Sequence, residues 1–165
     1  MVDPLFRVPQ PPIDLALTPL DDKVGFTLMA ICMVLVLVAA RFAWREWKRT
    51  GSPILMLMIL GGAVTNLAEP FVDLIGACWH PEIGQITLFE HMGRKMPLWL
   101  FFPYLAYFGA QAMTLYYVLN KGASRYTMWM WFIVPIIADI VLEECLLSFS
   151  DNLYAYYGNQ PLRFH

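Results

Sequence analysis

The sequence NLAEPFVDLIGACWH, residues 66–80, decides the fold because it places two carboxylates inside an otherwise apolar stretch. Glu69 and Asp73 are four residues apart, so they share one face of a helix. At helical spacing, the same face reaches Asn66 on one side and His80 on the other. The sequence therefore predicts a polar stripe on one face of an apolar helix.

The composition of the whole chain is typical of a membrane protein. Its 165 residues are 59% hydrophobic and 15% charged, whereas soluble domains are about 45–50% apolar and about 25% charged. The mean hydropathy is +0.54. A net charge of −2, with no basic stripe, argues against a nucleic-acid partner. The N-terminus lacks the basic start and small-residue cleavage site of a signal peptide, so we expect none.

Four apolar stretches are long enough to cross a hydrocarbon core, which takes about 20 residues. They cover residues 24–43, 53–78, 97–119 and 128–149. The fold predicted is an all-α, polytopic integral membrane protein, a four-span helical bundle. Its regions are an extramembrane N-terminal tail over 1–23, the bundle over 24–150 and a C-terminal tail over 151–165. Pro70 predicts a kink in the second stretch, close to Asn66.

The charges of the connectors predict an orientation. The connectors 41–52 and 120–126 carry Lys and Arg, while the N-terminal tail is acidic. Because basic loops stay in the cytoplasm, both termini are expected on the non-cytoplasmic side of a bacterial inner (plasma) membrane. Arg94 and Lys95, in the loop 79–96, depart from this rule.

Two further stretches carry polar stripes. In the fourth, Asp139 and Glu143 are four residues apart, and Glu144 lies about 100° further round the helix. The stripe of the third consists of Tyr104, Tyr107, Gln111 and Thr114. An ionisable side chain facing lipid at the bilayer centre costs about 2.5–3.5 kcal/mol. We therefore expect the stripes to face one shared cavity that opens toward the non-cytoplasmic side.

Three explanations for the intramembrane acids remain open, because no Lys or Arg lies deep in any stretch. The acids are protonated, or they bind a cation, or the cavity holds water. A fourth interpretation is a hydrated vestibule without chemistry, since both acid pairs lie toward the outer ends of their stretches.

Acids in an apolar, aromatic-rich cavity suit proton chemistry on a lipid. A protonated carboxyl can donate a proton to an alkene or epoxide, and an aromatic face can stabilise the cation that forms. Two acids whose environments differ supply a donor and a base together. The function predicted is binding of an apolar lipid in a carboxylate-lined cavity, with acid–base cyclisation or isomerisation.

The segment LEECLLSFSDNLYAYYGNQPLRF, residues 142–164, resembles the small integral-membrane cyclases of carotenoid and other isoprenoid pathways. The resemblance implies an isoprenoid ligand, with Glu143 and Glu144 as the paired functional acids and Asp151 as the acid that precedes an aromatic segment. Val141 stands where that family has a proline, and the order of acid pair and aromatic segment is reversed.

The candidate site therefore has two groups of residues. The candidate catalytic residues are Glu69, Asp73, Asp139, Glu143 and Glu144. The candidate substrate-binding residues are Asn66, Tyr104, Tyr107, Gln111 and Asp151.

No metal and no cofactor is predicted. The loop 79–96 offers the metal-ligand types His80, Glu82, Glu90 and His91, but their spacing matches no standard signature. Cys32, Cys78 and Cys145 form no CxxC pair and are interpreted as small buried hydrophobic residues.

Two functions of other classes stay open beside the enzyme. One is a non-enzymatic subunit or assembly factor of a larger membrane complex, whose acids meet cations of a partner membrane subunit. The other is a small cation- or proton-coupled carrier that works as a homo-oligomer. The location of the acids in one half of the bilayer disfavours the carrier, whose site lies near the midplane.

Overall fold

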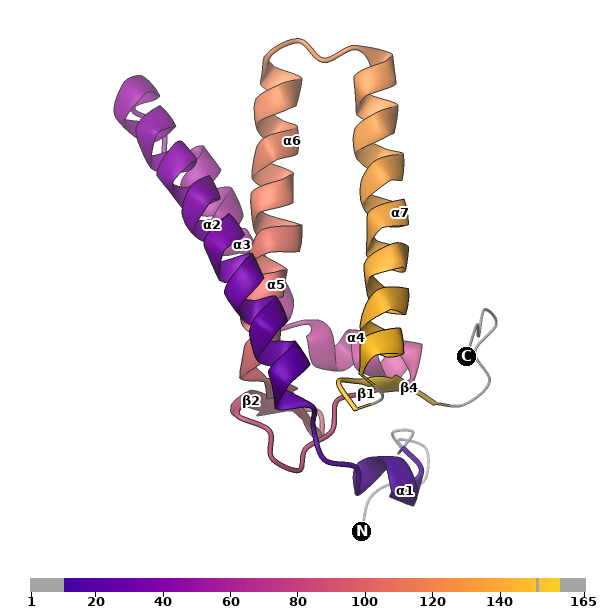
Figure 1. Ribbon diagram of the computed structural model, residues 1–165. Coiled ribbons are helices and arrows are strands. Elements are labelled where there is room, and N and C mark those ends of the chain that lie inside the picture. Colours follow the sequence, from indigo (N-terminus) through magenta and orange to yellow (C-terminus); the bar gives the residue numbers. More distant parts are fainter. Residues whose placement is uncertain (1–10, 151, 158–165) are drawn as a thin grey trace.

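The computed structural model describes residues 11–150 and 152–157, and this part of the chain is mostly helical (Figure 1). Its helices of eight or more residues are α2 (Asp22–Thr50), α3 (Ile54–Asn66), α4 (Glu69–Gly76), α6 (Gln111–Asn120) and α7 (Arg125–Phe149). The short helices are α1 (Ile13–Ala16) and α5 (Phe101–Tyr104). The α2–α3 and α6–α7 connections lie at one end of the molecule, and α1 lies at the other.

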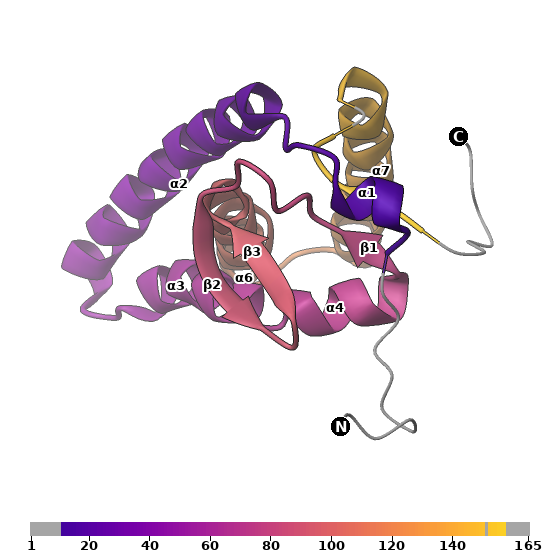
Figure 2. The same cartoon turned by 90° about the horizontal axis from the view of Figure 1, so that it is seen from below.

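Two small antiparallel sheets lie at the same end as α1. β2 (Thr87–His91) and β3 (Arg94–Pro97) form a hairpin. β1 (Cys78–Trp79) pairs with β4 (Ala155–Tyr156), which joins the chain after α4 to the chain after α7. Figure 2 shows the hairpin lying across the ends of the helices. The described chain is therefore mostly helical rather than all-α, and the predicted loop 79–96 contains most of this hairpin.

The first helix is longer than its apolar stretch. α2 begins after Asp21, whose carboxylate accepts a hydrogen bond from the Lys23 N–H at 3.2 Å. It ends at Gly51, whose φ of 76° suits glycine and whose N–H donates to the Trp47 carbonyl at 2.8 Å. The predicted end at residue 43 is wrong because residues 44–50 are mostly good helix formers. Most of the basic first connector is therefore a helical extension.

The second stretch is broken at the predicted place. α3 ends at Asn66, α4 begins at Glu69, and the two helix axes differ by 50°. Pro70 lies in the first turn of α4, where a backbone N–H would have no partner within the helix, so its absence there costs nothing. Without that N–H, Pro70 also cannot donate to an α3 carbonyl and extend the hydrogen bonds of α3. The kink predicted from Pro70 is confirmed.

The third stretch is a helical run of mixed geometry. It passes from a 3₁₀ turn (Leu98–Leu100) through α5 and a π-helical segment (Leu105–Ala110) into α6. The π segment packs closely on α3 at two glycines. A Cβ on Gly62 would lie 2.6 Å from the Tyr104 carbonyl oxygen, and a Cβ on Gly109 would overlap the Ile59 backbone. A Cβ on Gly61 or Gly76 would instead meet open space.

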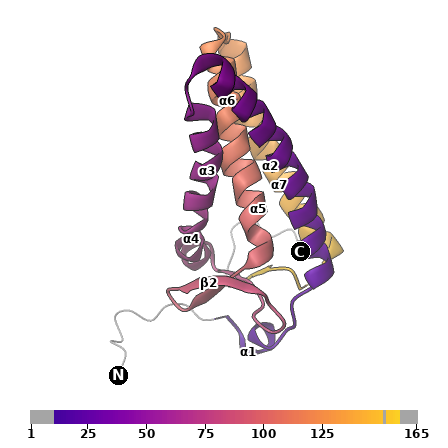
Figure 3. The same ribbon diagram turned by 90° about the vertical axis from the view of Figure 1, so that its left-hand side faces the viewer.

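The described residues form two hydrophobic clusters. The first joins α2, α3 and the third stretch through Val36, Ala43, Leu55, Ile59, Leu105 and Met113. The second lies near the sheets and consists of Cys78, Trp99, Leu100, Leu153 and Tyr154. α7 contributes no buried residue, and many of its large apolar side chains are exposed. Figure 3 gives the side view of these helices above the hairpin.

The described structure supports fewer membrane crossings than the four predicted. Among the described residues, one helix, over Lys23–Thr50, is long and apolar enough to cross a membrane, and α3 with α4 would make a second if the bent pair is one span. Length and composition are weak grounds for a crossing, since buried core helices and signal sequences share them. The third stretch is divided into short segments, and α7 carries Asp139, Glu143 and Glu144. A mostly helical chain is thus established, whereas a four-span bundle is not.

Candidate functional site: an acid-lined cavity

The predicted acid pairs from two separate helices line one cavity of about 510 Å³. Glu69 and Asp73 come from α4, and Asp139 and Glu143 come from α7. The 50° bend turns α4 away from the direction of α3 and places it between the bundle and β1. The i, i+4 spacing places both members of each pair on the cavity side.

The third stretch supplies the polar and aromatic wall between the acid pairs. Tyr104, Tyr107 and Gln111 line the cavity, as predicted, together with Phe108. The Phe108 ring lies 4.9 Å from that of Tyr104 and 5.0 Å from that of Tyr107. The Tyr107 hydroxyl donates a long hydrogen bond of 3.5 Å to the Pro135 carbonyl of α7. Single turns of π-helix are frequent at functional sites, and this one sets the positions of Tyr107 and Phe108.

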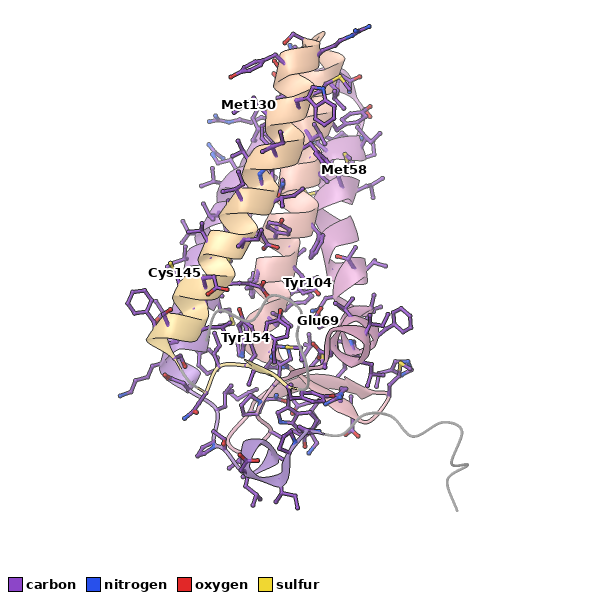
Figure 4. The ribbon with its side chains drawn as sticks, turned by 90° about the vertical axis from the view of Figure 1, so that its right-hand side faces the viewer. Met58, Glu69, Tyr104, Met130, Cys145 and Tyr154 are labelled. Atoms are coloured by element: carbon purple, nitrogen blue, oxygen red, sulfur yellow. The ribbon has the colours of Figure 1, made fainter. Side chains whose placement is uncertain are left out.

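The remaining wall is mainly apolar. The apolar residues that line it include Leu28, Leu35, Val72, Trp99, Leu100, Pro103, Ala106, Leu142 and Leu146. Figure 4 shows Glu69, Tyr104 and Tyr154 close together near the sheets, whereas Cys145 lies on the outer side of α7. The cavity thus combines a hydrophobic interior with a small number of ionisable groups, as ligand sites for apolar molecules do.

β4 and the residue before it bring two tyrosines to the cavity, Tyr154 and Tyr156, which were not among the predicted site residues. The Tyr156 hydroxyl donates to Glu143 Oε1 at 2.6 Å, and Tyr154 is buried next to it. Burial, above all, raises the pKa of both phenols, and in Tyr156 the hydrogen bond to Glu143 adds to the shift. Both therefore stay neutral, and Tyr156 remains a hydrogen-bond donor to Glu143 at physiological pH.

The chain after α4 adds two more groups. Ala77 adopts a left-handed conformation, with φ of 49°, and ends the helix. Cys78 and His80 then line the cavity beside Asp73. His80 Nε2 lies 3.6 Å from Asp73 Oδ1 and 3.7 Å from Glu69 Oε1. His80 was predicted on the helical stripe, but it reaches the acids by this chain reversal.

A buried arginine lies behind this group. Arg94 is 2% exposed, donates to the Tyr157 hydroxyl at 2.5 Å and stacks 4.6 Å from the centre of the Trp79 ring. Arg94 was predicted only to lie in the loop 79–96. Its burial depends on the local β2–β3 hairpin and on the return of the chain after α7, a long-range feature that brings Tyr157 to it.

Some predicted site residues lie elsewhere. Asn66 is buried, at 1% exposure, but does not line the cavity, and its Nδ2 meets no hydrogen-bond partner among the described residues. Glu144 is also not part of the lining. Asp151 lies outside the described residues.

The ligand types of the loop 79–96 are dispersed. Glu82 pairs with Lys95 at 3.0 Å, and Glu90 and His91 are exposed on β2. His80 alone faces the cavity. The interpretation of the three cysteines as buried is confirmed for Cys32 and Cys78 and is wrong for Cys145, which is exposed.

Chemically, the cavity offers carboxylates that face each other from two helices, neutral phenols and an apolar, aromatic wall. This set can bind an apolar molecule and exchange protons with it. The chain matches no protein-family model, no curated protein and no solved structure.

Proposed function

We propose that this protein is a membrane enzyme that binds an apolar lipid, most simply an isoprenoid, and cyclises or isomerises it by acid–base chemistry. One observation carries the proposal: Glu69 and Asp73 on α4, and Asp139 and Glu143 on α7, line the same cavity of about 510 Å³. Burying four carboxyl groups in apolar surroundings costs folding free energy, and ionisable groups in such places usually mark a functional site. The resemblance of residues 142–164 to isoprenoid cyclases supports the same class of substrate.

The reaction conserves atoms. A protonated carboxyl transfers its proton to a carbon–carbon double bond or an epoxide oxygen, and a carbocation forms in the lipid. A second double bond attacks this cation, or the cation migrates along the chain. A carboxylate from the opposite helix then removes a different proton, which yields an isomer of the substrate. The aromatic faces of Trp99 and Tyr104 line the cavity and stabilise the cation by cation–π attraction.

The proposed setting is a four-span bundle in a bacterial inner membrane, with both termini outside. Two features of the fold support it. The exposed apolar side chains of α7, such as Ile133 and Ile137, suit contact with lipid tails. The Lys and Arg residues of the first connector and Lys121 lie at the end of the molecule away from the cavity. The cavity then lies toward the non-cytoplasmic face, where a lipid enters sideways.

Solvent deuterium incorporation tests the reaction. The full chain, purified in mild detergent, is incubated in D₂O with linear isoprenoid alkenes, whose protonation step places the transferred proton on carbon. The exchangeable carboxyl proton is then deuterium, so each product carries one deuterium on carbon and a changed retention time. Glu143→Gln should abolish this incorporation, whereas Glu90→Gln, on the exposed β2 strand, should retain it. Absence of a deuterated isomer from every substrate, or full incorporation by Glu143→Gln, would contradict the proposal.

A second candidate function is a non-enzymatic subunit of a membrane complex. It is favoured by α7, in which no residue is buried although the helix is strongly apolar. Such a surface also fits the helices of a partner subunit. Purification in mild detergent separates the two functions, because a subunit would co-purify with a polypeptide in fixed stoichiometry and without a bound lipid.

A further inference from the structure

The floor of the cavity gathers three different metal-ligand types at the junction of α4 and β1. A carboxylate oxygen of Asp73, the Sγ of Cys78 and a ring nitrogen of His80 all lie within 4.8 Å of one another. The three residues are 2%, 7% and 5% exposed. Sulfur, imidazole and carboxylate donors in one set are typical of zinc and related divalent transition metals, whereas magnesium and calcium prefer oxygen alone.

The local backbone explains how residues so close in sequence converge. The left-handed Ala77 reverses the chain after α4, and its N–H donates to the Asp73 carbonyl. β1 follows in extended conformation, where alternate residues point to the same side. Cys78 and His80 therefore face the cavity together, whereas Trp79, between them, turns toward Arg94.

Three polar atoms of this group lack hydrogen bonds although they are buried, while Asp73 and Cys78 share a side-chain hydrogen bond. The three atoms, both ring nitrogens of His80 and Oδ2 of Asp73, have no hydrogen-bond partner within residues 11–150 and 152–157. Buried polar atoms are nearly always paired, because leaving one unpaired costs about 1–3 kcal/mol. These side chains point to a ligand that accepts their lone pairs.

The distances fit coordination better than hydrogen bonding. His80 Nε2 lies 3.6 Å from Asp73 Oδ1 and 3.7 Å from Glu69 Oε1, whereas hydrogen bonds between such atoms span about 2.7–3.2 Å. Ligands of a tetrahedral zinc ion, at bond lengths of about 2.0–2.3 Å, stand roughly 3.3–3.8 Å apart. The His80 and Asp73 atoms are thus spaced as two ligands of one ion are.

We infer that Asp73, Cys78 and His80 form a binding site for one divalent zinc-class cation. Three protein ligands leave the fourth position open to the cavity, beside Glu69, as in sites where the metal contacts a substrate or water. On binding, the Cys78 thiol releases its proton to solvent and coordinates as a thiolate. The inference goes beyond the lipid chemistry proposed above and does not require it, because the donors are complete without a substrate.

Cobalt(II) is the probe for the test, because it replaces zinc and its bond to a thiolate absorbs in the near ultraviolet. The full chain in mild detergent is stripped with a chelator and titrated with Co²⁺ alone. We expect one Co²⁺ per chain and a thiolate–cobalt absorption band, which Zn²⁺ then displaces. Cys78→Ser should remove the band, and His80→Gln should weaken Co²⁺ binding about tenfold or more.

Matched controls lie outside the cavity. Cys145→Ser and His91→Gln replace exposed residues of the same types and should keep the band and the stoichiometry. Wild-type protein that binds no Co²⁺ overturns the inference. A band that persists in Cys78→Ser, or that disappears in Cys145→Ser, overturns it as well.

Two further measurements keep the test decisive. If Cys78→Ser does not fold, the melting temperature replaces the band: Zn²⁺ should raise that of the wild type and fail to raise that of His80→Gln. Glu143→Gln should bind Co²⁺ as the wild type does, since Glu143 lies on α7 and is not one of the ligands. Wild-type protein that binds Co²⁺ but forms no deuterated isomer, or the reverse, therefore shows which proposal fails.

Discussion

At the residue scale, the decisive contrast is between two adjacent glutamates. Glu143 lines the cavity and accepts the 2.6 Å hydrogen bond from Tyr156, whereas Glu144 is not part of the lining. The resemblance to isoprenoid cyclases implies a function for both acids, but the geometry favours only the first. Testing them side by side separates the two arguments.

We expect Glu143→Gln to lower turnover by about 10²–10⁴-fold, the usual contribution of a general acid or base. Glu144→Gln should change it little, because its side chain lies off the cavity. The measurement is the initial rate of isomer formation at equal protein concentration, with the melting temperature as the control for folding. Equal losses in both variants would favour the paired-acid interpretation.

The buried phenol of Tyr154 should make the folded chain less stable at alkaline pH. Burial raises the pKa of its phenol in the folded chain above the ordinary value of about 10. Below about pH 10 both states keep this proton, and its contribution to stability is constant. Above that pH the unfolded chain loses the proton while the folded chain keeps it, so stability falls as pH rises.

We expect Tyr154→Phe to make this alkaline decline shallower. Melting temperatures followed by tryptophan fluorescence from about pH 9 to 12 measure the slope. Tyr126→Phe, at a tyrosine that is 74% exposed, is the matched control and should keep the wild-type slope. A Tyr154→Phe slope equal to that of the wild type would refute the assignment.

The sequence predicted the acid pairs but not the residues that face them. Glu69 with Asp73, and Asp139 with Glu143, follow from i, i+4 spacing, which is a local rule. Cys78, Tyr154 and Tyr156 reach the cavity through pairing of β1 with β4, whose partners are separated by nearly half of the chain. No local pattern reports such a pairing.

At the element scale, the kink of the second stretch was predictable because proline acts locally, and α3 does end next to Pro70. The π-helical segment Leu105–Ala110 was not predictable. A polar stripe with α-helical spacing does not reveal the wider i→i+5 hydrogen bonding of a π-helix. The β2–β3 hairpin was predicted only as a loop, because the burial pattern of β3, with Arg94 buried, is the opposite of what residue charge suggests.

Two adjacent glycines test the packing of α3 on the π segment. Gly62→Ala would put a methyl group 2.6 Å from the Tyr104 carbonyl and 2.8 Å from the Gly109 nitrogen. We expect a loss of about 1–3 kcal/mol, as for other overpacked contacts. Gly61→Ala, which faces open space on the same helix, should be neutral or slightly stabilising. The melting temperatures of the two variants, measured in the same detergent, test this expectation. Equal values would contradict the packing described.

At the scale of the whole molecule, the exposed apolar surface and the two differently charged ends argue for a membrane setting. The cavity, α1 and the sheets share one end, while the basic residues of the first connector and Lys121 lie at the other. The proposed orientation rests on the positive-inside rule. Labelling of introduced cysteines tests both the orientation and the proposed crossings.

We expect a membrane-impermeant maleimide to label Glu90→Cys in intact cells. Ser52→Cys and Ala123→Cys should react only after the membrane is opened, because both lie in connections at the basic end. The background is Cys145→Ser, which removes the exposed native thiol. Labelling of Ala123→Cys in intact cells would rule out the proposed topology.

The central claim is that the acid-lined cavity binds an apolar lipid, and native mass spectrometry with lipid extraction tests it most directly. The wild-type chain, purified in mild detergent, should carry one small apolar molecule per cavity, and extraction should identify its class. Glu69→Gln and Glu143→Gln should lose that molecule while Glu90→Gln keeps it. A wild-type chain that carries a partner polypeptide and no lipid, or a lipid that all three variants retain, would contradict the account.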